Sequence, residues 1–522
     1  MSLASPVGQA VDGHPSDSGA TADPTTLTLR HLGIDTYQEP VVYMSSECPV
    51  CRSEGWEALT RLQVRHQSHV ILTTLHVVTG KLLGPHEVSL SDAAWRMLGA
   101  SDGDEVSLSS PPPLESLAYV RSKIYGRRLD DREMEAIVSD IAAGGYSAVH
   151  LSAFVTACAG GRLDLEETIA LTRAMIRVGE QLKWTGHPIV DKHSVGGLPG
   201  NRTTLVVVPI VTTLGLTMPK TSSRAITSPA GTADAMETLA PVDLELPAMR
   251  RVVEREGGCI VWGGAVRLSP ADDVIIRVEQ PLDLDSEGQL VASVLSKKAA
   301  AGSSHVVIDM PVGPTAKVRG PDAAAALGSL LTAVGRAVGL EVRIERGDGS
   351  QPIGRGIGPA LEARDALAVL RGDADAPADL RERALVLAGS LVELATGVRP
   401  GEGYQLAQSA LDSGKALRKL EAICEAQGGM RLPPTAPHQQ VITAERAGVL
   451  SEIDNRRLAR IAKLAGAPKA SAAGLDLHVR LGSAVEANQP LFTVHAESPG
   501  ELTYALAYFK SSASPLRIGE PQ

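Results

Sequence analysis

Hydrophobic and polar positions follow two different periods along the chain. Between residues 25 and 110 they alternate in short runs, such as 41–43 and 106–108, and this period of two predicts an N-terminal β-rich domain. Three consecutive prolines at 111–113 then end the pattern, because they continue neither a strand nor a helix. We expect a domain boundary there, and we expect residues 1–24, rich in Ser, Gly, Asp and Thr, to form a disordered leader.

A spacing of three and four between apolar residues replaces this alternation over residues 114–185. It is the period of an amphipathic helix and predicts four short helices. Two of these helices begin with the spacing of a capping box, Asp130 with Glu133 and Asp164 with Glu167. The segment is therefore expected to form a small all-α domain.

The region that follows alternates strands, glycine-rich turns and helices. We expect residues 186–271 and about 301–430 to form an α/β domain with a mixed or parallel sheet. Residues from about 272 to 300 are helical in pattern and are assigned to the all-α domain. The last segment, 431–522, combines a helix at 455–464 with β-like runs and is expected to be an α+β domain. The fold class predicted for the whole chain is multidomain α/β.

Composition narrows the choice of function. The chain has 522 residues, of which 43% are hydrophobic and 21% charged, as is typical of a folded globular protein. Its net charge of −10 disfavours nucleic acid and membrane surfaces as partners. Five scattered cysteines make no disulfide framework, and no apolar stretch is long enough to span a membrane, so we expect a cytoplasmic protein.

Two loops at the ends of predicted strands carry the residues of an anion site. Residues 191–197 read Asp-Lys-His-Ser-Val-Gly-Gly, and residues 220–232 hold six hydroxyl groups and two cations. Glycine amides and helix N-termini bind phosphate, and ligands of open α/β sheets lie at the carboxyl ends of the strands. The alternative interpretation is a pair of tight turns with solvated polar side chains.

Both loops, together with Arg277 and residues 292–298, resemble the thymidine and pyrimidine-nucleoside phosphorylase family. The similarity runs from about Tyr119 to the C-terminus and includes 479–482 and 490–496. The long N-terminal domain and the second loop resemble the branch that includes AMP phosphorylases. The resemblance implies phosphorolysis, in which inorganic phosphate attacks the anomeric carbon of a nucleoside and yields a free base and a sugar 1-phosphate. It implies no cofactor beyond phosphate as co-substrate.

The resemblance also assigns roles to single residues. Four polar residues match the phosphate-holding positions: Lys192, Ser194, Ser222 and Thr232. Four residues match catalytic or base-gripping positions: Arg277, Lys297, His193, which faces the base, and Asp285, the proton donor of the AMP branch and otherwise a helix cap. The positions that match substrate contacts are Gly197, Ser223, Arg224, Ala225, Ile226, Thr227, Ser228, Thr232, Ser293 and Lys317.

Other interpretations stay open at this point. Cys48-x-x-Cys51 with His66-x-x-His69 resembles a zinc-ligand pattern, although the proposed chemistry needs no metal. The nearest rival activity is phosphorolysis of a nucleoside 5′-monophosphate, as in AMP phosphorylases. A phosphoribosyltransferase and a non-catalytic nucleotide-binding regulator are the further alternatives. Family members are commonly homodimers through the helical domain, so we expect a homodimer or a larger homo-oligomer.

Overall fold

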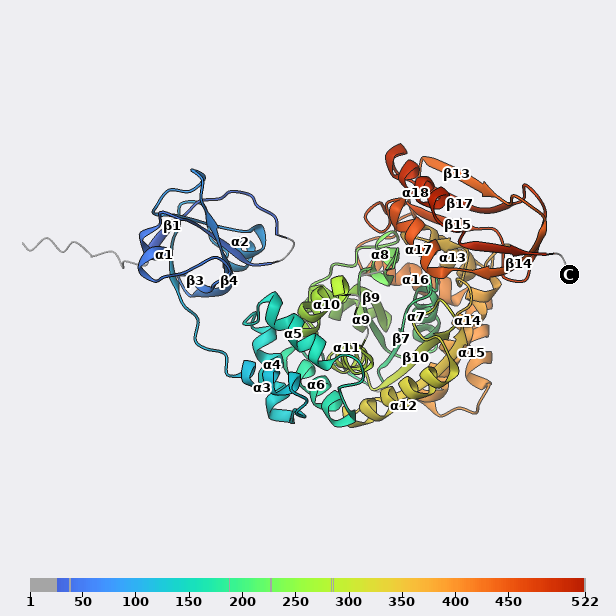
Figure 1. Cartoon of the computed structure of the whole chain (residues 1–522). Helices are drawn as coiled ribbons and strands as arrows, with labels where there is room; N and C mark the ends of the chain where they lie inside the picture. Colours follow the sequence, from blue (N-terminus) through green and yellow to red (C-terminus); the bar gives the residue numbers. More distant parts are fainter. Residues whose placement is uncertain are drawn as a thin grey trace, which may run out of the picture. The chain divides into compact units, whose positions relative to one another are not determined.

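The computed structural model describes residues 26–36, 39–186, 188–225, 228–282, 284 and 286–520. The chain divides into two compact units, Met1–Leu114 and Glu115–Gln522, which are drawn in Figure 1. The expected leader, residues 1–24, lies outside the described residues. Within the described part of the chain, no helix has both the length and the apolar character needed to cross a membrane.

The first unit is a closed β-barrel, which confirms the predicted β-rich fold. Its strands run around the barrel in the order β1-β5-β2-β4-β3-β6. Leu62 and Val64 alternate with more exposed neighbours along β3 and pack in the barrel core, as the period of two requires. The elements of this unit are β1 (Thr26–Leu29), β2 (Val41–Ser45), α1 (Pro49–Ser53), β3 (Arg61–His66), β4 (His69–Val78), β5 (Glu87–Leu90), α2 (Asp92–Leu98) and β6 (Glu105–Ser109).

The second unit begins with a bundle of helices. The four predicted helices are present, and both capping boxes form: Glu133 N donates to Asp130 Oδ1 over 2.8 Å, and Glu167 N donates to Asp164 Oδ1 over 2.8 Å. Two later helices, α10 and α11, pack against this bundle. Its elements are α3 (Ser116–Ile124), α4 (Asp131–Ala142), α5 (Ala148–Cys158), α6 (Leu165–Val178), α10 (Pro270–Leu282) and α11 (Glu287–Ala300).

Parallel strands form the centre of the second unit. The order β11-β10-β7 continues into β8-β9, because a parallel bridge from Ile189 to Thr217 joins the start of β7 to that of β8. The apolar helix α7 packs against α14 and α16 in the main core of the unit. The strands are β7 (Val190–Ser194), β8 (Met218–Ser222), β9 (Gly258–Trp262), β10 (His305–Val312) and β11 (Glu341–Asp348). The helices are α7 (Thr203–Thr213), α8 (Thr232–Glu237), α9 (Leu246–Glu256), η1 (Gly263–Val266), α12 (Pro321–Ala337), α13 (Pro359–Arg371), α14 (Ala378–Thr396), α15 (Glu402–Asp412) and α16 (Lys415–Ala426).

The C-terminal α+β region is built from antiparallel strand pairs and has its own core. One sheet has the order β12-β15-β17-β13 and the other the order β16-β14-β18. The predicted helix at 455–464 is confirmed as α17, and Asp454 caps its N-terminus. The elements are β12 (Gly356–Ile357), β13 (His438–Thr443), β14 (Gly448–Ile453), α17 (Asn455–Leu464), β15 (Gly474–Leu477), β16 (Ala484–Val485), β17 (Pro490–Ala496), α18 (Pro499–Ser511) and β18 (Leu516–Gly519).

A buried ion pair in the helical bundle provides a test of the fold. Lys123 Nζ lies 2.5 Å from Glu167 Oε1, and both side chains are almost inaccessible to solvent. Because Lys123→Met leaves a buried carboxylate without its cation, we expect it to lower the free energy of unfolding by about 3–5 kcal/mol in urea denaturation. Arg128→Ala, which breaks an exposed pair with Asp164, is the control and should cost at most about 1 kcal/mol. Equal losses in the two variants would contradict this prediction.

Candidate active site

Strand β7 divides its polar side chains between the two faces of the sheet. Because successive side chains alternate, Asp191 points toward α11 and Lys192 toward α7. Lys298 Nζ, on α11, lies 2.7 Å from Asp191 Oδ2. On the other face, Lys192 Nζ donates to Thr203 Oγ1, at the start of α7, over 2.6 Å. One short strand thus supplies charged groups to two separate environments.

Asp191 lies between two lysines. Its Oδ1 is 3.1 Å from Lys220 Nζ, in the middle of β8, and its Oδ2 contacts Lys298. Burial disfavours the charged carboxylate, but the two ammonium groups outweigh burial and hold the pKa of Asp191 below its ordinary value. Burial in turn lowers the pKa of Lys220 to about 7. This cluster joins β7, β8 and α11.

His193 lies on the same face of β7 as Asp191. Burial lowers its pKa well below the ordinary value, and the positive charges of Lys298, Lys220 and Lys297 act in the same direction. The imidazole is therefore neutral at physiological pH, with one N–H group to donate and one nitrogen to accept. A neutral donor beside several lysines suits contact with a carbonyl oxygen, the role predicted for His193.

The other face of β7 holds the first loop in place. Asp309 of β10 is fully buried; its Oδ2 accepts from Asn201 Nδ2 over 2.9 Å and lies 3.7 Å from Lys192 Nζ. Asn201 Nδ2 also reaches Ser194 Oγ, at 3.3 Å, while Arg383 Nε donates to Asp309 Oδ1 over 2.9 Å. Burial lowers the pKa of Lys192 to about 8, although Asp309 opposes the shift. Sequence reasoning missed Asp309, because its role depends on a strand distant in sequence.

The second loop is closed by Asp234 of α8. Its Oδ2 accepts hydrogen bonds from Ala225 N over 2.7 Å and from Gly231 N over 2.8 Å. A Cβ atom at Gly231 would lie 2.6 Å from Ser223 O, so the close approach of the two ends of the loop requires glycine. Ile226 and Thr227, which are predicted contacts, lie outside the described residues. Ser222 is the last residue of β8, and Ser228 lies inside the closed segment, where its Oγ donates to Ala230 O over 2.9 Å.

Arg224 of the second loop has acidic partners on α8, the helix that follows this loop. Its Nη2 is 2.9 Å from Glu237 Oε1, and its guanidinium lies 5.3 Å from the centre of the Trp262 ring. Hydrogen bonding to Glu237 raises the pKa of Arg224 further above its ordinary range. The positive charge of Arg224 is therefore largely balanced.

Gly197 and Lys317 meet although they are far apart in the sequence. Gly197 has a φ of +81°, and a Cβ atom there would lie 2.3 Å from Lys317 N. Only glycine permits this approach of two backbones. The structure thus brings together two residues predicted to contact the substrate.

Helices α10 and α11 carry the residues predicted to grip the base. Ser293 and Lys297 are four residues apart on α11 and so share one face of that helix. Lys297 forms an ion pair with the buried Asp272 of α10. Arg277, one turn further along α10, donates from Nε to Asp273 O over 3.2 Å. Asp285, the predicted proton donor, lies outside the described residues.

Arg202 is a second residue that sequence reasoning missed. It lies at the N-cap of α7, where the helix dipole disfavours a cation. Its Nη1 donates to Thr232 Oγ1 over 2.9 Å, and it forms an ion pair with Glu362 of α13. A positively charged residue at a helix N-terminus was the sequence signal that could have found it.

The zinc-ligand pattern does not assemble. Cys51 Sγ donates to Trp56 O over 3.2 Å, and His66 Nε2 lies 3.2 Å from Asp104 Oδ2. In the part of the chain that the structure describes, no three His, Cys, Asp or Glu residues are grouped as a metal would require. The zinc interpretation is therefore not supported.

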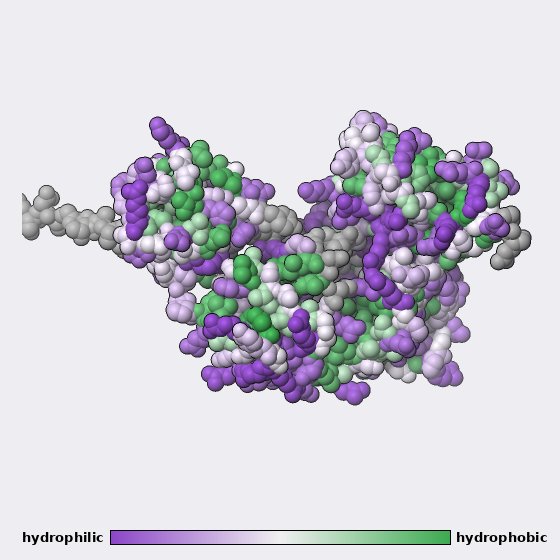
Figure 2. All heavy atoms as spheres, in the orientation of Figure 1, coloured by the Kyte–Doolittle hydropathy of each residue, from purple (hydrophilic) through white to green (hydrophobic). Residues whose placement is uncertain are grey.

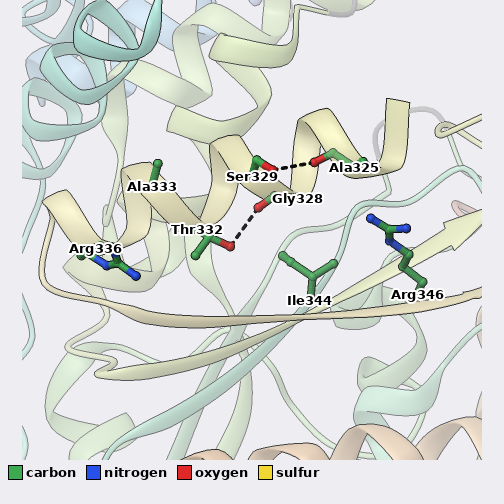
Figure 3. A pocket seen from close by; sticks show the side chains of 8 residues that line it. All are labelled: Ala325, Gly328, Ser329, Thr332, Ala333, Arg336, Ile344 and Arg346. Carbon is green, nitrogen blue, oxygen red and sulfur yellow. Dashed lines mark hydrogen bonds between the residues drawn. The ribbon is translucent and has the colours of Figure 1, made fainter. Parts of the chain in front are cut away.

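A hollow of about 430 Å³ opens between α12 and β11 (Figure 3). The hydroxyl groups of Ser329 and Thr332 in its wall donate to carbonyl groups of their own helix. The hollow shares no residue with the two loops or with α11. Its lining residues are Ala325, Gly328, Ser329, Thr332, Ala333, Arg336, Ile344 and Arg346.

Comparison with known proteins matches three segments to family models. Residues 117–179 match the helical bundle domain of a glycosyl transferase family, and residues 186–417 match its a/b domain. Residues 449–515 match the pyrimidine nucleoside phosphorylase C-terminal domain.

Full-length relatives and solved structures extend these matches. A protein of Polaromonas sp. strain JS666, provisionally named thymidine phosphorylase, is 62% identical over 497 residues, which are 95% of this chain and 97% of the relative. A protein of Legionella pneumophila strain Paris with the same provisional name is 58% identical over 494 residues, 95% of this chain and 96% of the relative. The anthranilate phosphoribosyltransferase of Thermus thermophilus aligns with a TM-score of 0.49 and 20% identity over 59% of this chain and 98% of that chain.

The low pKa of Lys192 predicts how anion binding depends on pH. If the charge of Lys192 helps to hold an anion, affinity is present while Lys192 is protonated and falls as the pH rises through about 8. Sulfate is a suitable probe because its own charge stays constant from about pH 7 to about pH 10. We expect the dissociation constant for sulfate, measured by calorimetry, to increase as the pH rises above about 8, by at most about tenfold for each pH unit.

The control is Lys510→Met, which removes an exposed lysine of α18 and should leave this profile unchanged. Lys192→Met should bind sulfate weakly at every pH. A dissociation constant that is flat across this range in the unmodified protein would refute the role of Lys192.

Proposed function

This chain belongs to the thymidine and pyrimidine-nucleoside phosphorylase family, and from that premise we propose that it cleaves thymidine with inorganic phosphate. It is a pentosyltransferase. The proposed reaction breaks the bond between the anomeric carbon and the base nitrogen and forms a bond from that carbon to a phosphate oxygen. The products are thymine and 2-deoxyribose 1-phosphate, and phosphate is the only co-substrate that the reaction needs.

In this proposal the two loops hold the nucleophile. Lys192, Ser194, Ser222 and Thr232 donate hydrogen bonds or charge to phosphate and keep one oxygen in line with the bond that breaks. Support comes from the way both loops are preorganised: Asp309 holds the first through Asn201, and Asp234 closes the second. Donors that are already held in place lose little freedom when the anion binds.

The leaving base takes the electron pair of the broken bond. In this proposal Lys297, Ser293 and Arg277 face it and His193 donates to a carbonyl oxygen, so that the developing negative charge is stabilised. Each preorganised donor of this kind is typically worth about 3–4 kcal/mol in the transition state. Support comes from the neutral state of His193 and from the position of Ser293 and Lys297 on one face of α11. Asp285 remains the candidate proton donor for the base.

The observation that carries the choice of thymidine is the pairing of Arg224. A nucleoside 5′-monophosphate would need an available cation in the second loop for its phosphate group. Arg224 is already bound by Glu237 at 2.9 Å and lies 3.3 Å from Asp234. A nucleoside without a 5′-phosphate makes no demand on that charge. The provisional names of the relatives point in the same direction.

A base-release assay tests the proposal. Purified protein is incubated with thymidine, uridine or AMP, with and without phosphate, and the free base is measured. We expect phosphate-dependent release from thymidine and none from AMP. Release confined to AMP would assign the chain to the nucleotide branch. Dependence on Mg²⁺ and a pyrophosphorylated ribose would indicate a phosphoribosyltransferase, and binding without turnover would indicate a non-catalytic regulator. Each of these outcomes would contradict the proposal.

Two variants test the assignment of the base site. Ser293→Ala and Lys297→Met should each lower kcat/KM for thymidine by about 10²–10³-fold, because each removes a donor to the leaving base. Lys510→Met removes an exposed lysine of α18 and serves as the matched control. Wild-type activity in both α11 variants would remove this helix from the site.

We further propose a cytoplasmic homodimer formed through the helical bundle. Several apolar side chains of the bundle are exposed, among them Val149 of α5, Ile124 of α3 and Leu165 of α6. Figure 2 shows hydrophobic side chains gathered over this bundle on the visible face. Large exposed apolar groups that lie together are typical of an interaction surface.

The oligomeric state can be tested by light scattering. We expect a mass of twice 54.6 kDa or a larger multiple for the unmodified protein, and a smaller mass for Val149→Glu, which places a charge on the proposed surface. Leu432→Glu, at an exposed apolar residue outside the bundle, is the control and should leave the mass unchanged. A monomeric wild-type protein would contradict the prediction.

A further inference from the structure

Arg202 occupies an unusual place between the two loops. It directly precedes α7, whose helix dipole repels a cation at this end, and only 13% of its side chain is exposed. A buried arginine in such a position must be held by specific partners. Those partners come from three different parts of the chain.

The guanidinium of Arg202 joins the second loop to the short segment between the first loop and α7. Its Nε donates over 3.2 Å to Gly200 O, which lies in that segment two residues earlier in the chain. Its Nη2 donates to Ala230 O over 3.3 Å and its Nη1 to Thr232 Oγ1 over 2.9 Å, which ties it to the second loop. The planar, rigid guanidinium therefore sets the spacing between this segment and the second loop.

Glu362 of α13 contacts the Nε atom of Arg202, whereas the second loop contacts its two Nη atoms. Its carboxylate forms an ion pair with Arg202 Nε, and Gly358 N donates to its Oε1 over 3.1 Å. Glu362 is only 2% exposed, so the pair is shielded from water and its geometry is restricted. The carboxylate thus keeps the other guanidinium nitrogens turned toward the second loop.

The contact with Thr232 determines where its hydroxyl proton points. A guanidinium has only donors, so the Thr232 oxygen must be the acceptor in this hydrogen bond. Its own proton is then left for another acceptor, and the described residues offer it none. An anion between the two loops is the acceptor that this arrangement fits.

We propose that Arg202, held by Glu362, is a positioning residue that sets the spacing of the two loops and aims the Thr232 hydroxyl at the bound phosphate. The inference rests on the proposed function for the identity of the anion. Arg202 acts through Thr232 and the loop backbones and does not take part in bond cleavage.

The test separates phosphate binding from the other steps. Arg202→Met should raise the KM and the calorimetric dissociation constant for phosphate by about ten- to a hundredfold, while the KM for thymidine stays within about twofold. Thr232→Val should have a similar effect, and the double variant should be no worse than the more affected single variant, because both changes remove one interaction. Arg381→Met, at a surface ion pair with Asp412, is the matched control.

Further variants keep the inference open to refutation. If Arg202→Met fails to fold, Arg202→Lys replaces it in the test. Lysine keeps the positive charge but lacks the planar guanidinium that makes several directed contacts at once, so this variant should still weaken phosphate binding. Unchanged phosphate affinity in a folded Arg202 variant, an equal rise in both KM values, or additive effects in the double variant would each overturn the role. Phosphate binding is measured without turnover. Inactivity of the wild-type protein on thymidine would therefore refute the proposed function, whereas the role of Arg202 would still be decided by the phosphate affinities of the variants.

Discussion

A buried carboxylate in the central sheet must be paired with cations, and the architecture around the site follows from that constraint. Asp191 is taken out of water by the sheet, and an isolated charge there would be strongly destabilising. Lys220 and Lys298 compensate it at 3.1 and 2.7 Å. Because these lysines come from β8 and α11, the pairing holds the second loop's strand, and the helix that carries Ser293 and Lys297, to the strand of the first loop. Three segments of the site are thereby fixed to one carboxylate.

The same principle recurs at the periphery of the site. Arg202 is backed by Glu362, Arg224 by Glu237, and Lys297 by Asp272. A cation with a carboxylate behind it is oriented and costs less to bury than a lone cation, and its remaining N–H groups can still face a ligand. The two loops and α11 therefore combine several donors with little uncompensated charge, an arrangement that fits the binding of phosphate in the proposed function.

Local signals in the sequence predicted the elements well. The helix at Asn455–Leu464 and the capping boxes at Asp130 and Asp164 depend on residues three or four positions apart, and such patterns survive in the folded protein. The partners of the site depend on tertiary contacts instead. Asp309 and Glu362 reach the loops from a strand and a helix that lie far along the chain, so no local period could indicate them. The family resemblance assigned roles to the loop residues but not to these supports, and the Cys-His pattern had the right residue types without the geometry.

The state of Arg224 connects this electrostatic design to the choice of substrate. A 5′-phosphate entering the second loop would have to compete with Glu237 and Asp234 for the guanidinium, and displacing them would leave two carboxylates facing an incoming anion. Asp234 cannot move away freely, because the same side chain closes the loop through Ala225 N and Gly231 N. A 5′-phosphate would therefore meet Asp234 as a fixed negative charge beside Arg224. A nucleoside without a 5′-phosphate does not face this repulsion, and this is the physical basis on which we propose thymidine rather than a nucleotide as the substrate.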